Sequence, residues 1–297
     1  MFERYQAIRH APMRNHTTLR LGGPADWLVT PETEEELAGC LAEAREAGLP
    51  VTVIGQGSNL LVLDGGIRGA VIRTRGLRSL RREGNRIMAG CGVMMGTAAG
   101  AALEAGLTGL EFASGIPGTV GGGTVMNAGA YGGEMSQVVR AARIMDRSGA
   151  VSIWTREQLD FGYRHSGLQG REEIVTEVTF ELTPGNPEEI RETMARLNRQ
   201  RAEKQPLDLP SAGSTFKRPQ GGYAAALIDQ CGLKGFAVGG ASVSEKHAGF
   251  LVNQGDSAAD YLKLVREVQR IVLEKTGIRL EPEIRILGEE APAELDD

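Results

Sequence analysis

The chain has 297 residues, 41% hydrophobic and 24% charged, a composition typical of globular proteins, and this length predicts two or three domains. Its net charge of -5 argues against nucleic acid as the main partner, because no basic excess is available to neutralise phosphates. No stretch is apolar enough for a signal peptide or a membrane span, and the histidines and cysteines lack metal-ligand spacing. We therefore expect a cytoplasmic protein with no metal site and no nucleic-acid or membrane partner.

The first half of the chain predicts a mixture of helices and short strands. A helix is expected to begin at Thr30-Pro31-Glu32, where a capping hydroxyl, a proline and an acid come together, and to end near Gly48. Its apolar face is expected to comprise Leu37, Cys40, Leu41 and Ala44. An alanine-rich helix is expected around 96–105. Buried or alternating apolar runs predict strands at 51–54, 60–63, 70–73 and 86–89.

Two well-marked helices follow in the second half. The first is expected to have Asn186 as N-cap and Pro187 as its first residue, and to stop at Gln205-Pro206. The second is expected from Ser257 to Lys275, closed by Gly277. Strands expected at 140–146 and 174–182 complete an α+β body. Because the stretch 206–219 breaks the periodicity and is flanked by prolines, we expect a domain boundary there.

The 41 glycines are about twice the usual share of ~7%, and they concentrate in two loops. Gly55-Gln56-Gly57-Ser58-Asn59 lies between two expected strands and can turn several backbone N–H groups towards one anion. The stretch 112–133 contains eight glycines. Two such loops suit an extended diphosphate cofactor. The alternatives are a tight turn for the first loop and close packing on a neighbouring strand for the second.

Six short motifs are spread along the chain. They are Asn15-His16-Thr17-Thr18 with Gly22-Gly23-Pro24-Ala25, Gly55-Gln56-Gly57-Ser58-Asn59-Leu60-Leu61, Ser114-Gly115-Ile116-Pro117-Gly118-Thr119-Val120-Gly121-Gly122, Tyr163-Arg164-His165-Ser166, Gly213-Ser214-Thr215-Phe216-Lys217 and Leu280-Glu281-Pro282-Glu283-Ile284-Arg285. In this order, from about residue 12 to residue 288, the chain resembles the shorter subtype of the UDP-N-acetylenolpyruvoylglucosamine reductase (MurB) family. Six motifs in register are more specific than any single glycine loop.

The resemblance implies an α+β fold with an FAD-binding body of the vanillyl-alcohol-oxidase (PCMH) type in two lobes, plus a smaller α+β substrate-binding domain. The lobes would be 1–80, joined by a returning strand at 281–290, and 81–205, and the domain binding the UDP-sugar would be 206–280. It also implies a reaction of peptidoglycan precursor synthesis. Non-covalent FAD, reduced by the co-substrate NADPH, would reduce UDP-N-acetylglucosamine enolpyruvate to UDP-N-acetylmuramate, in a chain expected to be monomeric.

By the family pattern, both glycine loops approach the FAD. The residues implied are Gly55, Gln56, Gly57, Ser58, Asn59, Leu60, Ser114, Gly115, Ile116, Pro117, Gly118, Thr119, Gly121 and Gly122. No histidine or cysteine lies within either loop, so a covalent flavin link is not expected. Gly123 and Thr124 stand where the family often has bulkier apolar residues, and we assign them no flavin contact.

The chemistry points to three catalytic candidates within these motifs. Hydride addition to the terminal enolpyruvyl carbon leaves negative charge on the adjacent carbon and its carboxylate, and that carbon then needs a proton. Arg164 can stabilise the charge through its planar cation, and Ser214 is a candidate proton donor. Glu283 would assist at the enolate if it is protonated or hydrogen-bonded there. Taken singly, these residues could equally be a surface ion pair, a turn hydroxyl and a strand-edge charge.

The substrate diphosphate predicts a set of cations, for which Lys217, Arg218 and Arg285 are the candidates. Arg218 departs from the asparagine common in the family. Tyr163 either closes over the substrate or braces Arg164. His165 and His247 are interpreted as structural histidines.

Two other classes of protein stay open on the sequence alone. A flavin oxidase of the same fold, acting on an alcohol or amine, would keep the flavin loops but would not need Ser214 and Glu283 around an enolate. A nucleotide-binding protein without turnover would need only the glycine loops.

Overall fold

The structure is a computed structural model that describes residues 1–5 and 7–291. The chain forms two compact units. The first comprises Met1–Ile8, Leu28–Gln56 and Gly69–Arg201, and the second comprises Arg9–Trp27, Gly57–Arg68 and the chain from Ala202 onward. The three-part division expected from the sequence stays a prediction.

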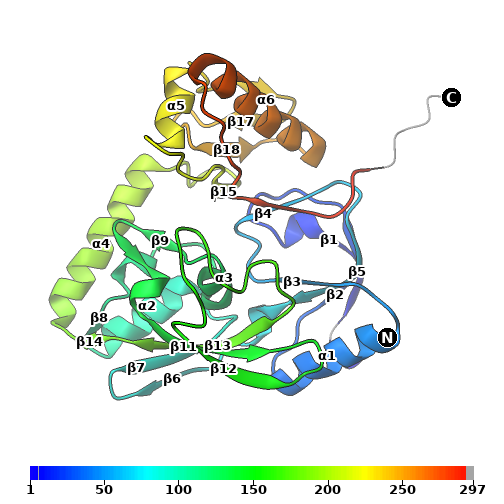
Figure 1. The fold of residues 1–297 in the computed structure, drawn as a ribbon, viewed down its shortest axis with the longest axis vertical. Coiled ribbons are helices and arrows are strands. Elements are labelled where there is room, and N and C mark those ends of the chain that lie inside the picture. Colours follow the sequence, from blue (N-terminus) through cyan, green and yellow to red (C-terminus); the bar gives the residue numbers. More distant parts are fainter. Residues whose placement is uncertain (6, 292–297) are drawn as a thin grey trace. The chain divides into compact units, whose positions relative to one another are not determined.

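The first unit is built around a five-stranded antiparallel sheet of order β12-β11-β13-β7-β6 (Figure 1). Helix α2 lies against β7, and α3 lies against β7 and β13. The strands of the sheet and the helices of this unit are β6 (Leu80–Glu83), β7 (Arg86–Gly90), β11 (Val139–Met145), β12 (Val151–Thr155), β13 (Ile174–Glu181), α1 (Glu34–Glu46), α2 (Met95–Glu104), α3 (Val120–Val125) and α4 (Pro187–Lys204), whose last turn enters the second unit.

Further strands lie wholly or mostly in the first unit. Strand β3 (Val51–Ile54) pairs in parallel with β5 (Ile67–Arg73), with Ile54 opposite Arg73. Two small pairs are β8 (Leu107–Thr108) with β14 (Thr183–Pro184) and β9 (Gly129–Ala130) with β10 (Gly133–Glu134). Short 3-10 turns occur at Thr74–Gly76, Glu111–Ala113 and Met135–Gln137.

The second unit contains a four-stranded antiparallel sheet of order β15-β18-β17-β16. Helix α6 lies against β16, β17 and α5, and encloses a core that includes the fully buried Tyr261, whose hydroxyl donates to the Leu251 carbonyl (3.2 Å). The elements are β15 (Ser211–Ser214), α5 (Ala224–Gln230), β16 (Ala237–Val238), β17 (Ala241–Val243), β18 (Phe250–Asn253) and α6 (Ala258–Thr276).

The C-terminal part of the chain returns to a strand near position 60 within the second unit. Strand β19 (Arg285–Leu287) pairs in parallel with β4 (Leu60–Val62). The remaining elements are β1 (Ile8–Pro12), β2 (Pro24–Val29), which runs from the second unit into the first, and a 3-10 turn at Met13–Asn15.

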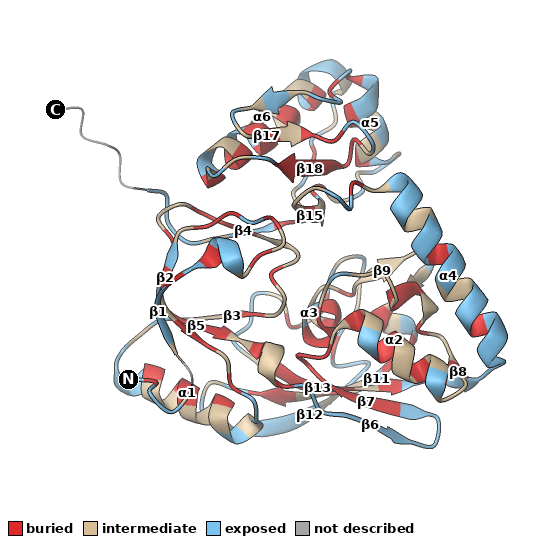
Figure 2. Cartoon of the chain, turned by 180° about the vertical axis from the view of Figure 1, so that it is seen from behind, coloured by how far each residue is buried: buried red, intermediate tan, exposed pale blue. Residues whose placement is uncertain are grey.

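Most predicted helices and strands are confirmed, and their ends follow local capping chemistry. In α4 the Asn186 side chain accepts from the Glu188 N–H (3.0 Å), with Pro187 as first residue. In α6 Ser257 accepts from the Asp260 N–H (3.1 Å), and Gly277 closes the helix at φ 72°. Figure 2 shows α4 exposed along most of its length. The buried residues of this helix are Ile190 and Leu197.

The predicted start of the first helix was wrong by one turn. The N-cap of α1 is Thr33, whose hydroxyl accepts from the Glu36 N–H at 3.1 Å, and not Thr30. The Glu36 carboxylate also accepts from the Glu32 N–H (2.7 Å), so these side-chain bonds satisfy the backbone where the expected first turn would have been. The predicted apolar face, Leu37, Cys40, Leu41 and Ala44, is buried.

Two general properties follow from the described residues. Among them, no helix is both long and apolar enough to cross a membrane. Within the same part of the chain, Cys40, Cys91 and Cys231 are buried and free, and no cluster of histidine, cysteine or acidic side chains is arranged to hold a metal.

Candidate active site

The first glycine loop offers a run of backbone donors. Within the described residues, no acceptor lies in hydrogen-bond geometry for the backbone N–H groups of residues 55–59. Gln56, in the first unit, has a buried side-chain oxygen that finds no hydrogen-bond partner there either. An unpaired buried polar atom is costly, so the Gln56 oxygen is available to a polar ligand at this end of the loop.

Glycine is required at two places in this loop for steric reasons. In the first unit, a Cβ on Gly55 would lie 2.5 Å from the Thr119 hydroxyl of the second glycine loop. In the second unit, Gly57 has φ +73°, and a Cβ there would lie 2.2 Å from the carbonyl of His16. The Thr18 N–H donates to the Gly57 carbonyl (3.1 Å), which ties the Asn15–Thr18 motif to this loop.

The second glycine loop, in the first unit, is partly explained by packing alone. A Cβ on Gly121 would lie 2.6 Å from the Cβ of Cys91, and one on Gly115 would lie 2.7 Å from the Asn198 side-chain oxygen on α4. Gly122 is different, because a Cβ there would meet only the Thr119 hydroxyl, at an ordinary 3.4 Å. For Gly115 and Gly121, the packing alternative left open by the sequence is therefore sufficient.

Thr119 orders the end of this loop. Its buried hydroxyl caps α3 by accepting from the Gly122 N–H (3.3 Å), and the Val120 N–H donates to the Val93 carbonyl (2.8 Å). Within the described residues, the N–H groups of Gly115, Gly118 and Thr119 have no acceptor. Within the first unit, these donors, the N–H groups of Gly55 and Gln56 and the unpartnered Gln56 oxygen are polar groups suited to a polar cofactor.

Gly123 and Thr124 are accounted for inside α3, as the sequence analysis allowed. A Cβ on Gly123 would lie 2.9 Å from the sulfur of Met95, and the fully buried Thr124 donates its hydroxyl to the Val120 carbonyl (2.9 Å).

Arg164 lies in the first unit in a strained conformation. Its φ is +52°, a region that side-chain-bearing residues rarely occupy. Its guanidinium donates to the carbonyls of Asn127 (3.4 Å) and Gly129 (2.9 Å), and stacks 5.4 Å from the ring of the exposed Tyr163. This contact is the one that a bracing role requires, and the choice between bracing Arg164 and closing over the substrate stays a prediction.

Asn127 lies in the glycine-rich stretch 112–133 and was not among the residues expected in the site. It is fully buried, with φ +43°, and both the nitrogen and the oxygen of its side-chain amide form hydrogen bonds. Its Nδ2 donates to the Gly162 carbonyl (2.8 Å) and its Oδ1 accepts from the Ser136 N–H (2.9 Å). An asparagine directly after a short helix is the available sequence signal, because asparagine tolerates left-handed backbone.

Ser214 lies in the second unit at the end of a bulged strand. Ser211 pairs with Val252 and Ser214 with Phe250, so β15 has one residue more than its partner β18. Gly213 takes φ +78° within the bulge, and Ser214 is exposed. A bulge of this kind re-aims the side chain that follows it.

Glu283 belongs to the segment beside Ser214. Its N–H donates to the carbonyl of Thr215 (2.8 Å), and its carbonyl accepts from the Asn59 amide (3.1 Å). The structure therefore brings Ser214, Glu283 and the end of the first glycine loop together within the second unit.

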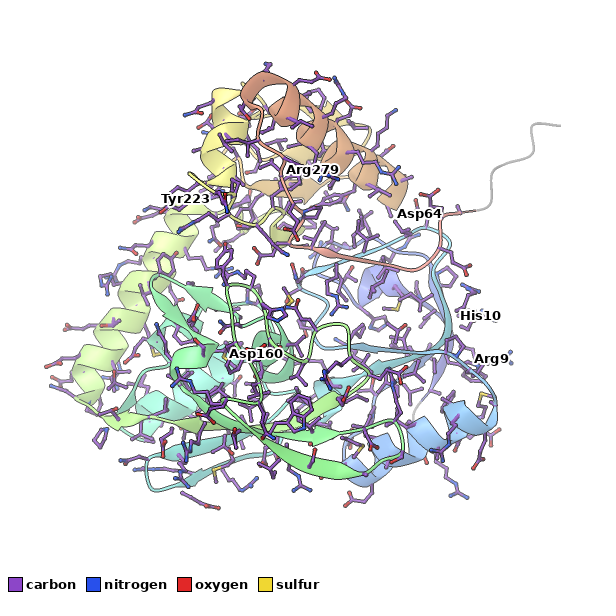
Figure 3. All side chains as sticks on the ribbon, in the orientation of Figure 1. Arg9, His10, Asp64, Asp160, Tyr223 and Arg279 are labelled. Atoms are coloured by element: carbon purple, nitrogen blue, oxygen red, sulfur yellow. The ribbon has the colours of Figure 1, made fainter. Side chains whose placement is uncertain are left out.

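The three cationic candidates differ in their surroundings. Lys217 pairs with Glu281 through both backbone and side chain. Arg218 stacks 4.1 Å from the ring of Tyr223, which Figure 3 labels and which is 61% exposed. Arg285 is exposed on β19 opposite Leu60, and its N–H donates to the Asn59 carbonyl (3.0 Å). All three lie in the second unit, whereas Arg164 and Tyr163 lie in the first.

His247 is satisfied within the second unit. Its Nδ1 accepts from the Gly249 N–H (3.1 Å), its ring meets Phe250 edge-on with centroids 4.9 Å apart, and burial lowers its pKa. These contacts account for His247 without a catalytic role. His165 is exposed, and its backbone pairs with that of Gly162.

Comparison with known proteins gives matches over nearly the whole chain. The family model for the UDP-N-acetylenolpyruvoylglucosamine reductase C-terminal domain matches residues 205–287, and one for an FAD binding domain matches residues 25–153. The UDP-N-acetylenolpyruvoylglucosamine reductase of Clostridium botulinum is 50% identical over 280 residues, 94% of this chain and 92% of the relative. That of Pediococcus pentosaceus is 47% identical and covers 97% of both.

A solved structure agrees with these matches. The crystal structure of UDP-N-acetylenolpyruvylglucosamine reductase (MurB) from Thermus caldophilus is 38% identical and superposes with a TM-score of 0.82, covering 96% of this chain and 99% of that one. The predicted fold class, an α+β chain with an FAD-binding body, is confirmed.

Proposed function

The chain belongs to the UDP-N-acetylenolpyruvoylglucosamine reductase family, and on that premise we propose that it reduces UDP-N-acetylglucosamine enolpyruvate to UDP-N-acetylmuramate at the expense of NADPH. It is an FAD-dependent oxidoreductase. The observation that carries the proposal is the 50% identity over 94% of the chain. The product is a peptidoglycan precursor, and we place the enzyme in the cytoplasm as a monomer.

FAD would be held without a covalent bond by the two glycine loops. The donors at residues 55–59, the side-chain oxygen of Gln56 and the open face of Gly122 support this assignment. The same proposal covers the other residues expected on both loops, which run from Gly55 to Leu60 and from Ser114 to Gly122 with the exception of Val120. Once bound, the flavin supplies the hydride.

Arg164 would stabilise the negative charge that develops on the enolpyruvyl carboxylate and the adjacent carbon. Its guanidinium is already held by two carbonyls, so it needs little reorganisation when the charge appears. Arginine suits this role because its fork can donate to two oxygens at once.

Ser214 would deliver the proton to that carbon from its Oγ. The bulge in β15 presents the hydroxyl away from the strand ladder, which leaves it available to a substrate. Glu283, whose backbone is paired beside Ser214, would support the enolate or the hydroxyl, and must share a proton or hydrogen bond to do so.

Lys217, Arg218 and Arg285 would bind the substrate diphosphate, and Tyr163 would contribute to binding next to Arg164. All three cations lie in the same unit as Ser214. Arg218 would give up its stack on Tyr223 to reach a phosphate, while Lys217 would share its charge with Glu281.

One anaerobic absorbance experiment tests the proposal against its rivals. NADPH should bleach the flavin, and UDP-N-acetylglucosamine enolpyruvate should then restore the oxidised spectrum. A flavin oxidase would need oxygen or another acceptor for reoxidation, and a binding protein would show neither step. Failure of the enolpyruvyl nucleotide to reoxidise the reduced flavin would refute the proposed reaction.

A further inference from the structure

The segment that presents Arg164 is held by hydrogen bonds from buried and half-buried polar side chains rather than by a sheet. Gln169 donates its amide N–H to the Arg164 carbonyl (2.9 Å), and the buried Ser166 donates its hydroxyl to the carbonyl of Val125 at the end of α3 (2.7 Å). Gly162 and His165 exchange backbone hydrogen bonds of 3.0 and 3.1 Å. The loop is therefore tied down on both sides of Arg164.

Asn127 is hydrogen-bonded to both the backbone and a side chain of this loop. Its side chain donates to the Gly162 carbonyl, two residues before Arg164, while its own backbone carbonyl accepts from the Arg164 guanidinium. Its Oδ1 also accepts from the Ser136 N–H, which anchors the amide plane from the opposite side. One buried side chain thus orders both the backbone that carries Arg164 and the surface on which its cation lies.

The strain in this region requires such an anchor. Both Asn127, at φ +43°, and Arg164, at φ +52°, occupy left-handed backbone, which residues with side chains rarely adopt and which persists where the surroundings enforce it. Two such residues joined by hydrogen bonds indicate that the loop is built for the position of a group. Arg164 carries the only charged side chain of the pair.

We infer that Asn127 is a positioning residue for Arg164. Its side-chain amide holds the Gly162 backbone two residues before Arg164, and its own backbone carbonyl accepts from the guanidinium, so that the cation is preorganised before the reaction. Asn127 itself touches no reacting atom. The inference rests on the proposed function, because it gives Arg164 its role at the enolate.

The first test replaces the amide without adding backbone strain. Asn127→Gly keeps the left-handed backbone accessible and removes both side-chain hydrogen bonds. Reoxidation of the reduced flavin by UDP-N-acetylglucosamine enolpyruvate, followed in anaerobic single-turnover measurements, should slow by about 10- to 100-fold, as expected for a displaced catalytic group. Reduction of the flavin by NADPH should keep its rate.

Asn253 offers a matched control in the other unit. It is also a buried asparagine, and its amide donates to the Leu19 carbonyl (3.1 Å) and accepts from the Gly255 N–H (3.0 Å). Asn253→Ala should lower the melting temperature by an amount similar to Asn127→Gly and leave both half-reactions unchanged. Equal slowing of both half-reactions in Asn127→Gly, together with lost FAD, would mean a merely structural role and would overturn the inference.

A double-mutant cycle with Arg164→Lys separates positioning from general destabilisation. If Asn127 acts through Arg164, adding Asn127→Gly to Arg164→Lys should cost much less than it does in the wild type. Multiplicative losses would contradict the inference. A readout without turnover is the exchange of the Arg164 side-chain N–H protons with water, measured by nitrogen-15 NMR, which should accelerate in Asn127→Gly.

If Asn127→Gly does not fold, Gln169→Ala serves in its place. It removes one tie to the Arg164 carbonyl and should produce a smaller, selective slowing of reoxidation, and an unchanged rate would count against the inference. Failure of the proposed function is distinguishable, because it would appear in the wild-type protein as no reoxidation by the enolpyruvyl nucleotide.

Discussion

The two units position their candidate site residues by different means. In the first unit, Arg164 is placed by a strained loop and by hydrogen bonds from the buried Asn127 and Ser166 and the half-buried Gln169. In the second unit, Ser214 and Glu283 are placed by backbone pairing and a bulge, and the Ser214 side chain is exposed. Side-chain changes should therefore affect chemistry alone in the second unit, but both chemistry and local order in the first.

The largest expected effect is at Gly57, which does not follow the difference between the two units. Although it belongs to the second unit, its position depends on steric fit, because a Cβ there would lie 2.2 Å from the His16 carbonyl at φ +73°. Gly57→Val should therefore lose nearly all bound FAD, measured as the ratio of flavin to protein absorbance. Gly84→Val is the matched control, because Gly84 has a similar φ of +58° with nothing within 4 Å of a Cβ. Stoichiometric FAD in Gly57→Val would remove this loop from the cofactor site.

Ser214 gives the sharpest separation of chemistry from folding. Ser214→Ala should keep FAD and its reduction by NADPH, but should slow reoxidation by the enolpyruvyl substrate by roughly 100- to 10,000-fold, the usual contribution of a general acid. Ser214→Cys should recover part of the rate, and Ser211→Ala, on the same strand, should behave as wild type. An unchanged single-turnover rate in Ser214→Ala would show that another group delivers the proton.

Arg164→Lys should have a smaller effect than loss of the proton donor. The substitution keeps the positive charge but loses the fork that donates to two oxygens. We expect reoxidation to slow by roughly 10- to 100-fold, less than the 100- to 1,000-fold typical of losing an oxyanion donor entirely. If single-turnover kinetics instead show a loss as large as that of Ser214→Ala, the geometry of the fork matters more than its charge.

The smallest expected effect lies in a polar contact of the first unit outside the candidate site. Glu34, in the first turn of α1, is hydrogen-bonded by the Arg143 guanidinium and the Thr176 hydroxyl, and these bonds hold its pKa below the ordinary 4.5. A lowered folded-state pKa stabilises the protein above the unfolded-state pKa, and this stabilisation is lost as the pH falls through the folded-state value.

Glu34→Gln should therefore be less stable than the wild type at pH 7 by about 1 kcal/mol or less, because the pair is partly exposed to solvent. The difference in melting temperature should shrink as the pH is lowered below 4.5. A difference that persists unchanged at acid pH would mean that packing, and not the charge of Glu34, is responsible. Both half-reactions should be unaffected.

The sequence by itself determined the features that depend on neighbouring residues. Asn186 with Pro187, and Ser257 with Gly277, mark the ends of α4 and α6 because capping bonds form within one turn of the chain. The first glycine loop was expected to approach the cofactor for its bare backbone, and that role stays a prediction. The six motifs were enough to indicate the family.

Only the tertiary structure decided features in which distant residues meet. The packing of Gly121 against Cys91 and of Gly115 against α4 shows that some glycines of the second loop serve close approach within the protein. The bulge that presents Ser214 depends on its register with β18, which no local pattern encodes. Asn127 gains its role from a carbonyl 35 residues away, at Gly162, because buried polar groups take whatever partner the fold brings to them.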